Sequence, residues 1–202
     1  MIGLGYIILF VAYFFVARTV VRFTTKWASN NNKSVRLWRI ITIIGMLSIV
    51  FWDLIPIYGT HTYQCASNGG FSVYKTLDEW KKDNPGVAET LVPVDGAKST
   101  QGGETIRYQL NQRFAWDTTR SQVWYTLYKK DEQIVDIQTG EVLAENIDFY
   151  TNLINPMVIP TTQLRDFKMW MKINSCEKSG RRINRKRFYQ FEAIIENLGE
   201  GR

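Results

Sequence analysis

The chain has 202 residues, 45% of them hydrophobic and 22% charged, with a formal net charge of +6 and two cysteines. This mixture excludes a disordered chain and leaves room for one compact domain beside any membrane segments. The positive charge does not indicate a nucleic-acid partner, because the part of the chain from Gly59 onward is close to neutral. The excess comes from basic residues that precede the first acidic residue, Asp53, namely Arg18, Arg22, Lys26, Lys33, Arg36 and Arg39.

The first apolar run, residues 2–17, predicts a transmembrane helix over about residues 2–21. A helix of about 20 residues crosses the roughly 30 Å of a bilayer, with Arg18 reaching the lipid headgroups. A secretory signal peptide is the alternative. The run has neither the basic n-region nor the small-x-small cleavage site of such a peptide, so we expect an anchor.

The second apolar run, residues 40–58, predicts a second transmembrane helix over about residues 37–57. Residues 22–36 form the basic loop between the two helices, and the asparagine run at residues 30–32 predicts its turn. Because positively charged loops stay in the cytoplasm, we expect the N-terminus and everything after residue 58 in the periplasm. Residues 1–58 would then form a transmembrane hairpin in a bacterial inner membrane. Small residues expected to allow close helix approach are Gly3, Gly5 and Gly45.

Asp53 lies inside the second apolar run, shortly before Pro56. An ionisable group in a membrane span is a functional candidate, because burying it without a partner costs several kcal/mol. Its place in the last turns, near the outer interface, favours a structural role, in which the carboxylate reaches water or caps a turn. Asp53 is therefore a candidate membrane-interface polar site, and proton or ion handling is the less favoured alternative.

Residues 59–202 are predicted to form an α+β domain, with a mainly antiparallel meander of strands and helices at its edges and C-terminus. Alternating side chains predict strands over residues 70–77, 106–110 and 123–128. The clearest signal is a β-hairpin over residues 133–147, in which Gly140 supplies the positive φ of the turn. Residues 84–104 are rich in Gly, Pro, Ser and Asp and are expected to form a long exposed loop.

Three helices are predicted in this domain. Thr76 and Glu79 have the spacing of a capping box, which opens a short helix through Trp80. Pro160 can open a second helix, in which Leu164, Phe167 and Met171 share a face. The third covers about residues 181–198, with an apolar face formed by Ile183, Phe191, Ile194, Ile195 and Leu198.

Basic residues crowd the start of the C-terminal helix, where they oppose the helix macrodipole. The candidate contacts with a partner or with lipid are Lys178, Arg181, Arg182, Arg185, Lys186 and Arg187. Phe188 and Tyr189 follow directly, and a basic amphipathic helix with aromatic residues suits an interface. A solvated helix face is the alternative, and the sequence leaves both open.

Cys65 and Cys176 both fall in the part of the chain that the charge rule places outside the cytoplasm. An even number of cysteines in an oxidising compartment predicts one structural disulfide. A metal site with His61 is less well supported, because two cysteines and one histidine are one ligand short of a closed zinc site. We therefore expect neither a metal nor a cofactor.

Enzyme motifs match poorly. His61 is the only histidine, and it follows the second apolar run without the Ser and Asp partners of a hydrolase triad. The glycines at residues 102–103 lack the lysine and the helix of a phosphate loop. The neighbouring carboxylates Asp131 and Glu132 are interpreted as a solvated hairpin face. The sequence therefore favours a protein that is not an enzyme.

Several short strings of this chain are similar to one group of proteins. The strings are Trp52-Asp53-Leu54-Ile55-Pro56, Tyr63-Gln64-Cys65, Val73-Tyr74-Lys75-Thr76 and the segment 139–145, together with the late Cys176. With them the chain resembles small uncharacterised inner-membrane proteins of Gram-negative bacteria. The resemblance implies a bacterial envelope setting and carries over no catalytic residue.

The function predicted from these features is a non-enzymatic accessory or interaction subunit of a bacterial inner-membrane complex. Its expected partners are a larger integral membrane protein complex and the phospholipid bilayer, and not nucleic acid. One alternative is an envelope defence, immunity or superinfection-exclusion protein that blocks a toxin or phage factor. A second alternative is a periplasmic ligand-binding sensor, with Trp116, Trp124 and Tyr125 as the walls of its pocket.

Overall fold

The computed structural model describes residues 2–94, 99–153, 166, 168–176 and 180–198, with the backbone alone at residues 2–6, 169 and 180–183. Contacts divide the chain into two compact units. The helical unit comprises Met1–Gly59 and Leu153–Met171, and the sheet unit comprises Thr60–Asn152 and Lys172–Arg202. The predicted helix from Pro160 through Leu164 and Phe167 lies outside the described residues.

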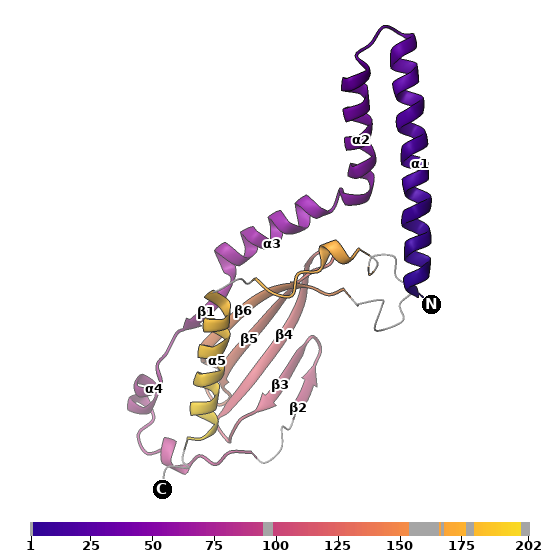
Figure 1. The fold of residues 1–202 in the computed structure, drawn as a ribbon. Coiled ribbons are helices and arrows are strands. Elements are labelled where there is room, and N and C mark those ends of the chain that lie inside the picture. Colours follow the sequence, from indigo (N-terminus) through magenta and orange to yellow (C-terminus); the bar gives the residue numbers. More distant parts are fainter. Residues whose placement is uncertain (1, 95–98, 154–165, 167, 177–179, 199–202) are drawn as a thin grey trace. The chain divides into compact units, whose positions relative to one another are not determined.

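The helical unit contains α1 (Ile2–Asn30), α2 (Val35–Phe51), the start of α3 (Leu54–Asn68) and the short 3-10 helix η3 (Met169–Met171). α1 and α2 lie side by side (Figure 1). The Trp27 and Trp38 rings meet edge to face at 5.2 Å, and the Thr42 hydroxyl donates to Thr24 Oγ1 at 3.0 Å. A Cβ at Gly45 would meet nothing within 4 Å, so Gly45 does not mark a close approach between α1 and α2.

The connection between α1 and α2 is shorter than predicted. α1 continues through Asn30, so most of the expected loop 22–36 is helical. The Thr24 and Thr25 hydroxyls bond back to carbonyls one turn earlier, which satisfies them inside the helix. The turn falls at Asn31 and Asn32, as the asparagine run predicted, and Asn32 adopts a φ of 51°. Ser34 then caps α2 by accepting from the Leu37 N–H at 3.4 Å.

The second predicted helix, over about residues 37–57, is broken in two. α2 ends at Phe51, α3 begins at Leu54, and the two helices bend by 57°. Pro56 explains the break, since inside a continuous helix its ring would clash with the carbonyl four residues earlier and its missing N–H would leave a bond unmade. As the third residue of α3, Pro56 needs no intrahelical donor.

One described helix, Ile7–Asn30 within α1, is long and apolar enough to cross a membrane by length and composition. α2 and α3 meet that test only together, as a bent pair. The most apolar 18-residue stretch of this helix has no residue buried inside the protein, whereas the core helix of a soluble domain is mostly buried. A membrane span and an N-terminal signal sequence both have this composition.

The sheet unit has an α+β fold built on a six-stranded antiparallel sheet, which confirms that part of the predicted fold class. The strands are β1 (Gly70–Val73), β2 (Ser99–Gly102), β3 (Thr105–Gln109), β4 (Phe114–Trp124), β5 (Leu127–Asp136) and β6 (Val142–Thr151). Their spatial order is β1-β6-β5-β4-β3-β2, so β2 to β6 form a meander and β1 pairs at the β6 edge. The helical elements are the end of α3, α4 (Leu77–Asp83), η1 (Ala88–Thr90) and α5 (Gly180–Glu196).

Two local predictions are confirmed within this unit. Thr76 and Glu79 form the capping box of α4, with the Thr76 N–H donating to Glu79 Oε2 at 2.8 Å. The β5–β6 hairpin turns where expected, with Gly140 at a φ of 74° and its N–H donating to the Asp136 carbonyl at 2.8 Å. In both cases a few neighbouring residues determine the conformation.

Two other predictions are wrong. The expected strand over residues 123–128 contains the β4–β5 turn, where Tyr125 adopts a φ of 47°, which is uncommon for a bulky residue. The expected loop 84–104 contains η1 and β2, and Ala88 and Leu91 are buried. Their side chains pack into the hydrophobic core, whereas β2 is exposed along its whole length.

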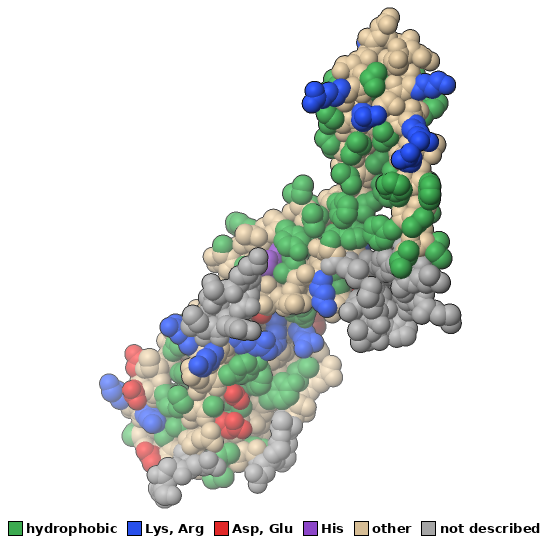
Figure 2. Space-filling model, in the orientation of Figure 1, with side chains coloured by type: hydrophobic (Ala, Val, Ile, Leu, Met, Phe, Trp, Pro, Cys, Tyr) green, Lys and Arg blue, Asp and Glu red, His purple; other side chains and the backbone are tan. Residues whose placement is uncertain are grey.

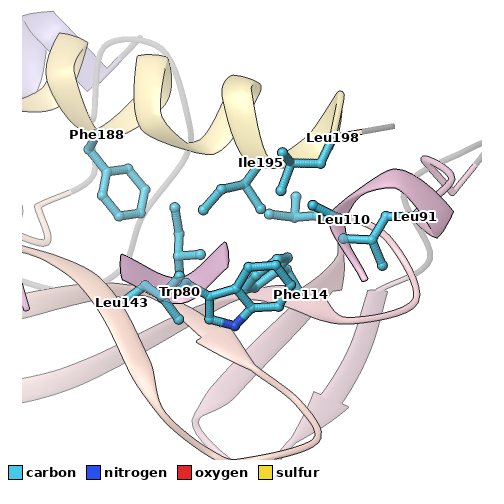
Figure 3. Close-up of a cluster of buried hydrophobic side chains, with 10 residues drawn as sticks. Trp80, Leu91, Leu110, Phe114, Leu143, Phe188, Ile195 and Leu198 are labelled. Carbon is cyan, nitrogen blue, oxygen red and sulfur yellow. The ribbon is translucent and has the colours of Figure 1, made fainter. Parts of the chain in front are cut away.

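The core of the sheet unit lies between one face of the sheet, α4 and α5 (Figure 3). Its main members are Trp80, Leu91, Leu110, Phe114, Leu143, Phe188, Ile195 and Leu198. Phe188 is fully buried, with Phe71 and Trp116 each 6.1 Å away ring to ring. Ile194 was predicted to lie on the apolar face of the C-terminal helix. This prediction is wrong, because the Ile194 side chain is 56% exposed.

Candidate functional site

The first candidate site is the Asp53 cluster, which we define as Phe51, Trp52, Asp53, Lys168 and Trp170 of the helical unit. Asp53 stands at the break between α2 and α3, and its side chain is fully buried. The Lys168 ammonium donates to Asp53 Oδ2, and Trp170 Nε1 lies 3.5 Å from Oδ1. The Trp52 ring centroid lies 5.5 Å from Lys168 Nζ, and the Phe51 and Trp170 rings meet at 5.0 Å.

The expectation that the Asp53 side chain reaches water or caps a turn is wrong. Its carboxylate is engaged by Lys168, and it is the Asp53 backbone carbonyl that accepts from the Ile57 N–H, at 3.1 Å. The Asp53 carboxylate is buried, which strengthens its attraction to the partly exposed Lys168 ammonium. The pair joins residues 115 positions apart in the sequence, so it fixes the segment around η3 to the helix break.

The second candidate site surrounds the disulfide. Cys65 and Cys176 are bonded, as predicted, with their Cα atoms 5.3 Å apart. His61 lies one turn before Cys65 on α3, so both side chains project from the same helix face. His61 Nε2 is 3.3 Å from Cys65 Sγ and 3.3 Å from the Phe149 carbonyl oxygen. Since a carbonyl oxygen only accepts hydrogen bonds, Nε2 carries the proton of the ring.

This group has the spacing of metal ligands, because His61 Nε2 and the two sulfurs all lie within 4.8 Å of one another. A metal ion would need two thiolates and an unprotonated imidazole nitrogen. In the oxidised chain both sulfurs belong to the disulfide and Nε2 is protonated, so the donors do not fit. A disulfide beside a histidine N–H can instead take part in thiol chemistry.

The third candidate site is the basic face of α5, formed by the exposed residues Arg185, Lys186 and Arg187. Lys178 lies outside the described residues, and Arg181 and Arg182 are described as backbone only. Arg185 donates to the Tyr189 hydroxyl from two nitrogens, at 3.1 and 3.3 Å. This bond raises the pKa of Arg185, burial lowers it, and the carboxylates of Glu132 and Asp148 raise it further.

Part of the basic face thus has acidic partners within the sheet unit. The negative charges of Glu132 and Asp148 offset the unfavourable position of Arg185 near the start of α5. Phe188 belongs to the core, so it is not available to a partner, whereas Tyr189 is half-buried and packs against Trp116 at 5.9 Å. Arg185, Lys186 and Tyr189 border a shallow hollow of about 440 Å³ that is open to solvent.

The sheet also carries a polar cluster that was not predicted. The Tyr74 hydroxyl donates to Glu145 Oε2 at 2.5 Å, and Lys129 Nζ donates to Asp131 Oδ2 at 2.6 Å. Burial raises the pKa of Asp131, Lys129 lowers it and Glu145 raises it. Burial also raises the pKa of Glu145, but hydrogen bonds from Tyr74 and Gln133 outweigh this and lower it. Asp131 is therefore the first of the two carboxylates to take up a proton as the pH falls.

The pairing of Asp131 and Glu132 as one solvated face is wrong, because successive strand residues point to opposite faces. Glu132 is 1% exposed and accepts from Asn146 Nδ2 at 3.0 Å. The pairing of Glu132 with Asn146 follows from the register of the predicted β5–β6 hairpin, because that register places the next residue, Gln133, opposite Glu145. By contrast, no signal in the sequence connects Lys168 with Asp53.

The three aromatic residues proposed as pocket walls do not meet. Trp116 lies in the core against Phe188, whereas Trp124 stands next to the β4–β5 turn. Eight residues of β4 separate them, which is about 26 Å along a strand. Tyr125 packs beside Trp124 with ring centroids 6.2 Å apart, at the turn. These side chains therefore line no common pocket.

Comparisons with protein-family models, with curated proteins and with solved structures found no match to this chain. The resemblance to small inner-membrane proteins of Gram-negative bacteria therefore stays a prediction. A function for the Asp53 cluster, the disulfide or the basic face of α5 must therefore be inferred from the chemistry of their residues.

Proposed function

We propose that this chain is a non-enzymatic accessory subunit of a larger complex in the inner membrane of a bacterium. α1 and α2 form a transmembrane hairpin whose turn lies in the cytoplasm, and the sheet unit lies in the periplasm. The hairpin packs against a larger membrane protein, and the sheet unit docks on the outer part of that protein. The observation that carries the proposal is the apolar outer surface of α1 and α2.

That surface consists of large side chains that the protein itself does not cover. Phe14 and Phe15 on α1 are each 61% exposed, and Ile49 on α2 is 67% exposed. α2 contributes no buried residue. Figure 2 displays these apolar side chains along the helix pair, with basic side chains gathered beside the turn. Helices that are apolar on all sides are covered by lipid or by other helices.

The length of α2 favours helices over lipid as part of that cover. α2 has 17 residues before the break at Asp53, whereas a span needs about 20. A short span is accommodated by a thinner bilayer, by anchoring residues at its ends or by association with neighbouring helices. A partner protein that packs against α2 would supply such association.

The proposed orientation rests on charge and on the disulfide. Six basic residues and no acidic residue precede Asp53, and they lie in and beside the turn between α1 and α2. Such a cluster holds the turn in the cytoplasm. The Cys65–Cys176 bond is stable in an oxidising compartment, which in a bacterium is the periplasm.

The test is purification of the tagged full chain from its native host in nanodiscs, with a photo-crosslinking residue placed in turn at Phe14, Phe15, Ile44 and Ile49. We expect a stoichiometric membrane protein to co-purify and to crosslink from some of these positions and not from others. Crosslinking to lipid alone from all four positions, with a monomer as the only product, would contradict the proposal. The matched control places the same residue at Asn31, in the exposed turn between α1 and α2.

A second experiment separates the proposal from an envelope-defence role, which uses the same topology. Deletion of the gene should reduce the amount or the activity of the co-purified complex in unchallenged cells. If the complex is intact and the cells instead become sensitive to one phage or toxin, the defence function replaces the proposed one.

A further inference from the structure

The disulfide lies beside a proton donor that a purely structural crosslink does not need. His61 Nε2 carries a proton and lies 3.3 Å from Cys65 Sγ. His61 is 8% exposed and its Nε2 is held by the Phe149 carbonyl, so the donor is already oriented before any reaction. Donors in such positions stabilise thiolates and make a thiol a better leaving group.

The two sulfurs have different surroundings. The Asp148 carboxylate accepts from the backbone N–H of Cys176 at 3.4 Å, whereas His61 Nε2 lies 3.3 Å from the sulfur of Cys65. An N–H beside a sulfur favours the thiolate. When the bond breaks, the negative charge is therefore more stable on Cys65 than on Cys176.

Gly69 lies against the sulfur of Cys176. A Cβ at Gly69 would lie 3.1 Å from Cys176 Sγ and 2.9 Å from the Cys65 carbonyl oxygen. Any other residue at position 69 would crowd Cys176 Sγ, and glycine leaves that side of the sulfur without a side chain. Both cysteines are half-buried, so the disulfide is not sealed inside the core.

We propose that Cys65–Cys176 is a redox-active disulfide that exchanges with an external dithiol, with His61 as the positioning residue that stabilises the Cys65 thiolate. This inference does not depend on the proposed membrane partner.

The exchange proceeds in two steps. A thiolate of the dithiol attacks Cys176 Sγ, the S–S bond breaks, and the electron pair leaves on Cys65 beside the His61 N–H. The second thiolate of the dithiol then attacks the sulfur of its own chain in the mixed disulfide and releases Cys176. The dithiol is oxidised to a disulfide, and the cysteine pair gains two electrons. Of the two protons that the dithiol loses, one passes to Cys176 and the other to the solvent, and Cys65 remains a thiolate beside the His61 N–H.

The test compares the full chain in detergent with His61→Leu, His61→Gln and the surface variant Lys186→Gln, using dithiothreitol as the dithiol. A hydrogen bond to a charged group changes an equilibrium constant by at least about tenfold. The equilibrium constant for reduction of the disulfide should therefore be about tenfold smaller in His61→Leu. This corresponds to a reduction potential that is lower by about 30 mV. His61→Gln keeps an N–H donor and should recover most of the loss, and Lys186→Gln should match the wild type. Equal reduction constants for all four proteins would overturn the proposal.

A second measurement needs no variant and so does not depend on how His61→Leu folds. The wild-type chain is exposed briefly to glutathione, quenched with an alkylating agent and digested for mass spectrometry. Glutathione should be found on Cys176 and the alkyl group on Cys65. The reverse distribution, or an equal one, contradicts the role given to His61 and Gly69.

Discussion

Asp136 is a buried carboxylate that the fold keeps charged through several donors. It is fully buried and accepts from Trp80 Nε1 at 2.9 Å and from Arg113 Nε at 2.7 Å. The backbone N–H groups of Gln138 and Thr139 donate to it at 2.9 and 3.3 Å. Burial raises the pKa of Asp136, but these hydrogen bonds outweigh burial and lower it below the ordinary value of 3.8. One residue thus connects α4, the start of β4 and the β5–β6 turn.

Asp136→Asn should lower the free energy of unfolding at pH 7 by about 3 kcal/mol, because it leaves Arg113 without its charge partner and turns an amide N–H toward other donors. A lowered pKa stabilises the folded chain above the ordinary pKa, and this stability is lost as the pH falls through the folded-state pKa. The free energies of unfolding of the variant and of the wild type should therefore become more similar below about pH 4. Urea unfolding of the full chain in detergent measures both effects.

The control for this prediction is Glu89→Gln, since Glu89 is an exposed carboxylate in the same unit. Its effect should stay within about 0.5 kcal/mol. A loss at Asp136→Asn that is no larger than the loss at Glu89→Gln would show that the hydrogen bonds of Asp136 contribute nothing to stability.

At the scale of elements, the break between α2 and α3 is held by both a local and a long-range cause. Pro56 prevents a continuous helix, and the Asp53 cluster fills the gap that results. The proline was visible in the sequence, whereas Lys168 and Trp170 reach Asp53 only through the folded chain. The sequence therefore predicted one helix over about residues 37–57, where the structure has two helices with a bend between them.

Asp53→Ala and Lys168→Ala should each destabilise the helical unit by about 2 to 3 kcal/mol, because each leaves one charge without its partner. The double variant should lose less than the sum of the two, by at least about 1 kcal/mol. Thermal unfolding of the full chain in detergent, followed by helix content, gives the three values. Additive losses would mean that the two residues act separately. Lys172→Ala, an exposed lysine outside the helical unit, is the matched control.

At the scale of the whole molecule, one covalent bond connects the end of α3 with the segment before α5. Cys65 and Cys176 are 111 residues apart, and the closed loop contains every strand of the sheet. Closing a loop of this length removes much of the freedom of the unfolded chain. The disulfide therefore favours the fold of the sheet unit mainly through the unfolded state.

The double variant Cys65→Ala and Cys176→Ala should unfold with a free energy lower by about 4 to 5 kcal/mol. The wild-type chain held in excess dithiothreitol should unfold at nearly the same denaturant concentration as the double variant. Equilibrium urea unfolding at one detergent concentration measures all three samples. If the double variant and the oxidised wild type unfold together, the bond does not stabilise the fold.

The sequence by itself determined two kinds of feature: those that depend on a few residues adjacent in the sequence, and the disulfide, for which the two cysteines allow one pairing. Thr76 and Glu79 cap their own helix, Gly140 turns its own hairpin, and two cysteines in one chain have one intramolecular pairing. The apolar character of α1 and the antiparallel sheet also followed, because each repeats one simple pattern over many residues.

Only the tertiary structure decided which polar groups are buried and which partners they have. Asp53 meets Lys168 from a distant segment, and Phe188 joins the core although it follows directly on a run of basic residues. Tyr125 forms a turn with a φ that its residue type disfavours, because the pairing of Trp124 with Leu127 brings β4 and β5 together on its two sides. Local preference is worth a few tenths of a kcal/mol to about 1 kcal/mol per residue, so contacts between distant segments override it at such positions.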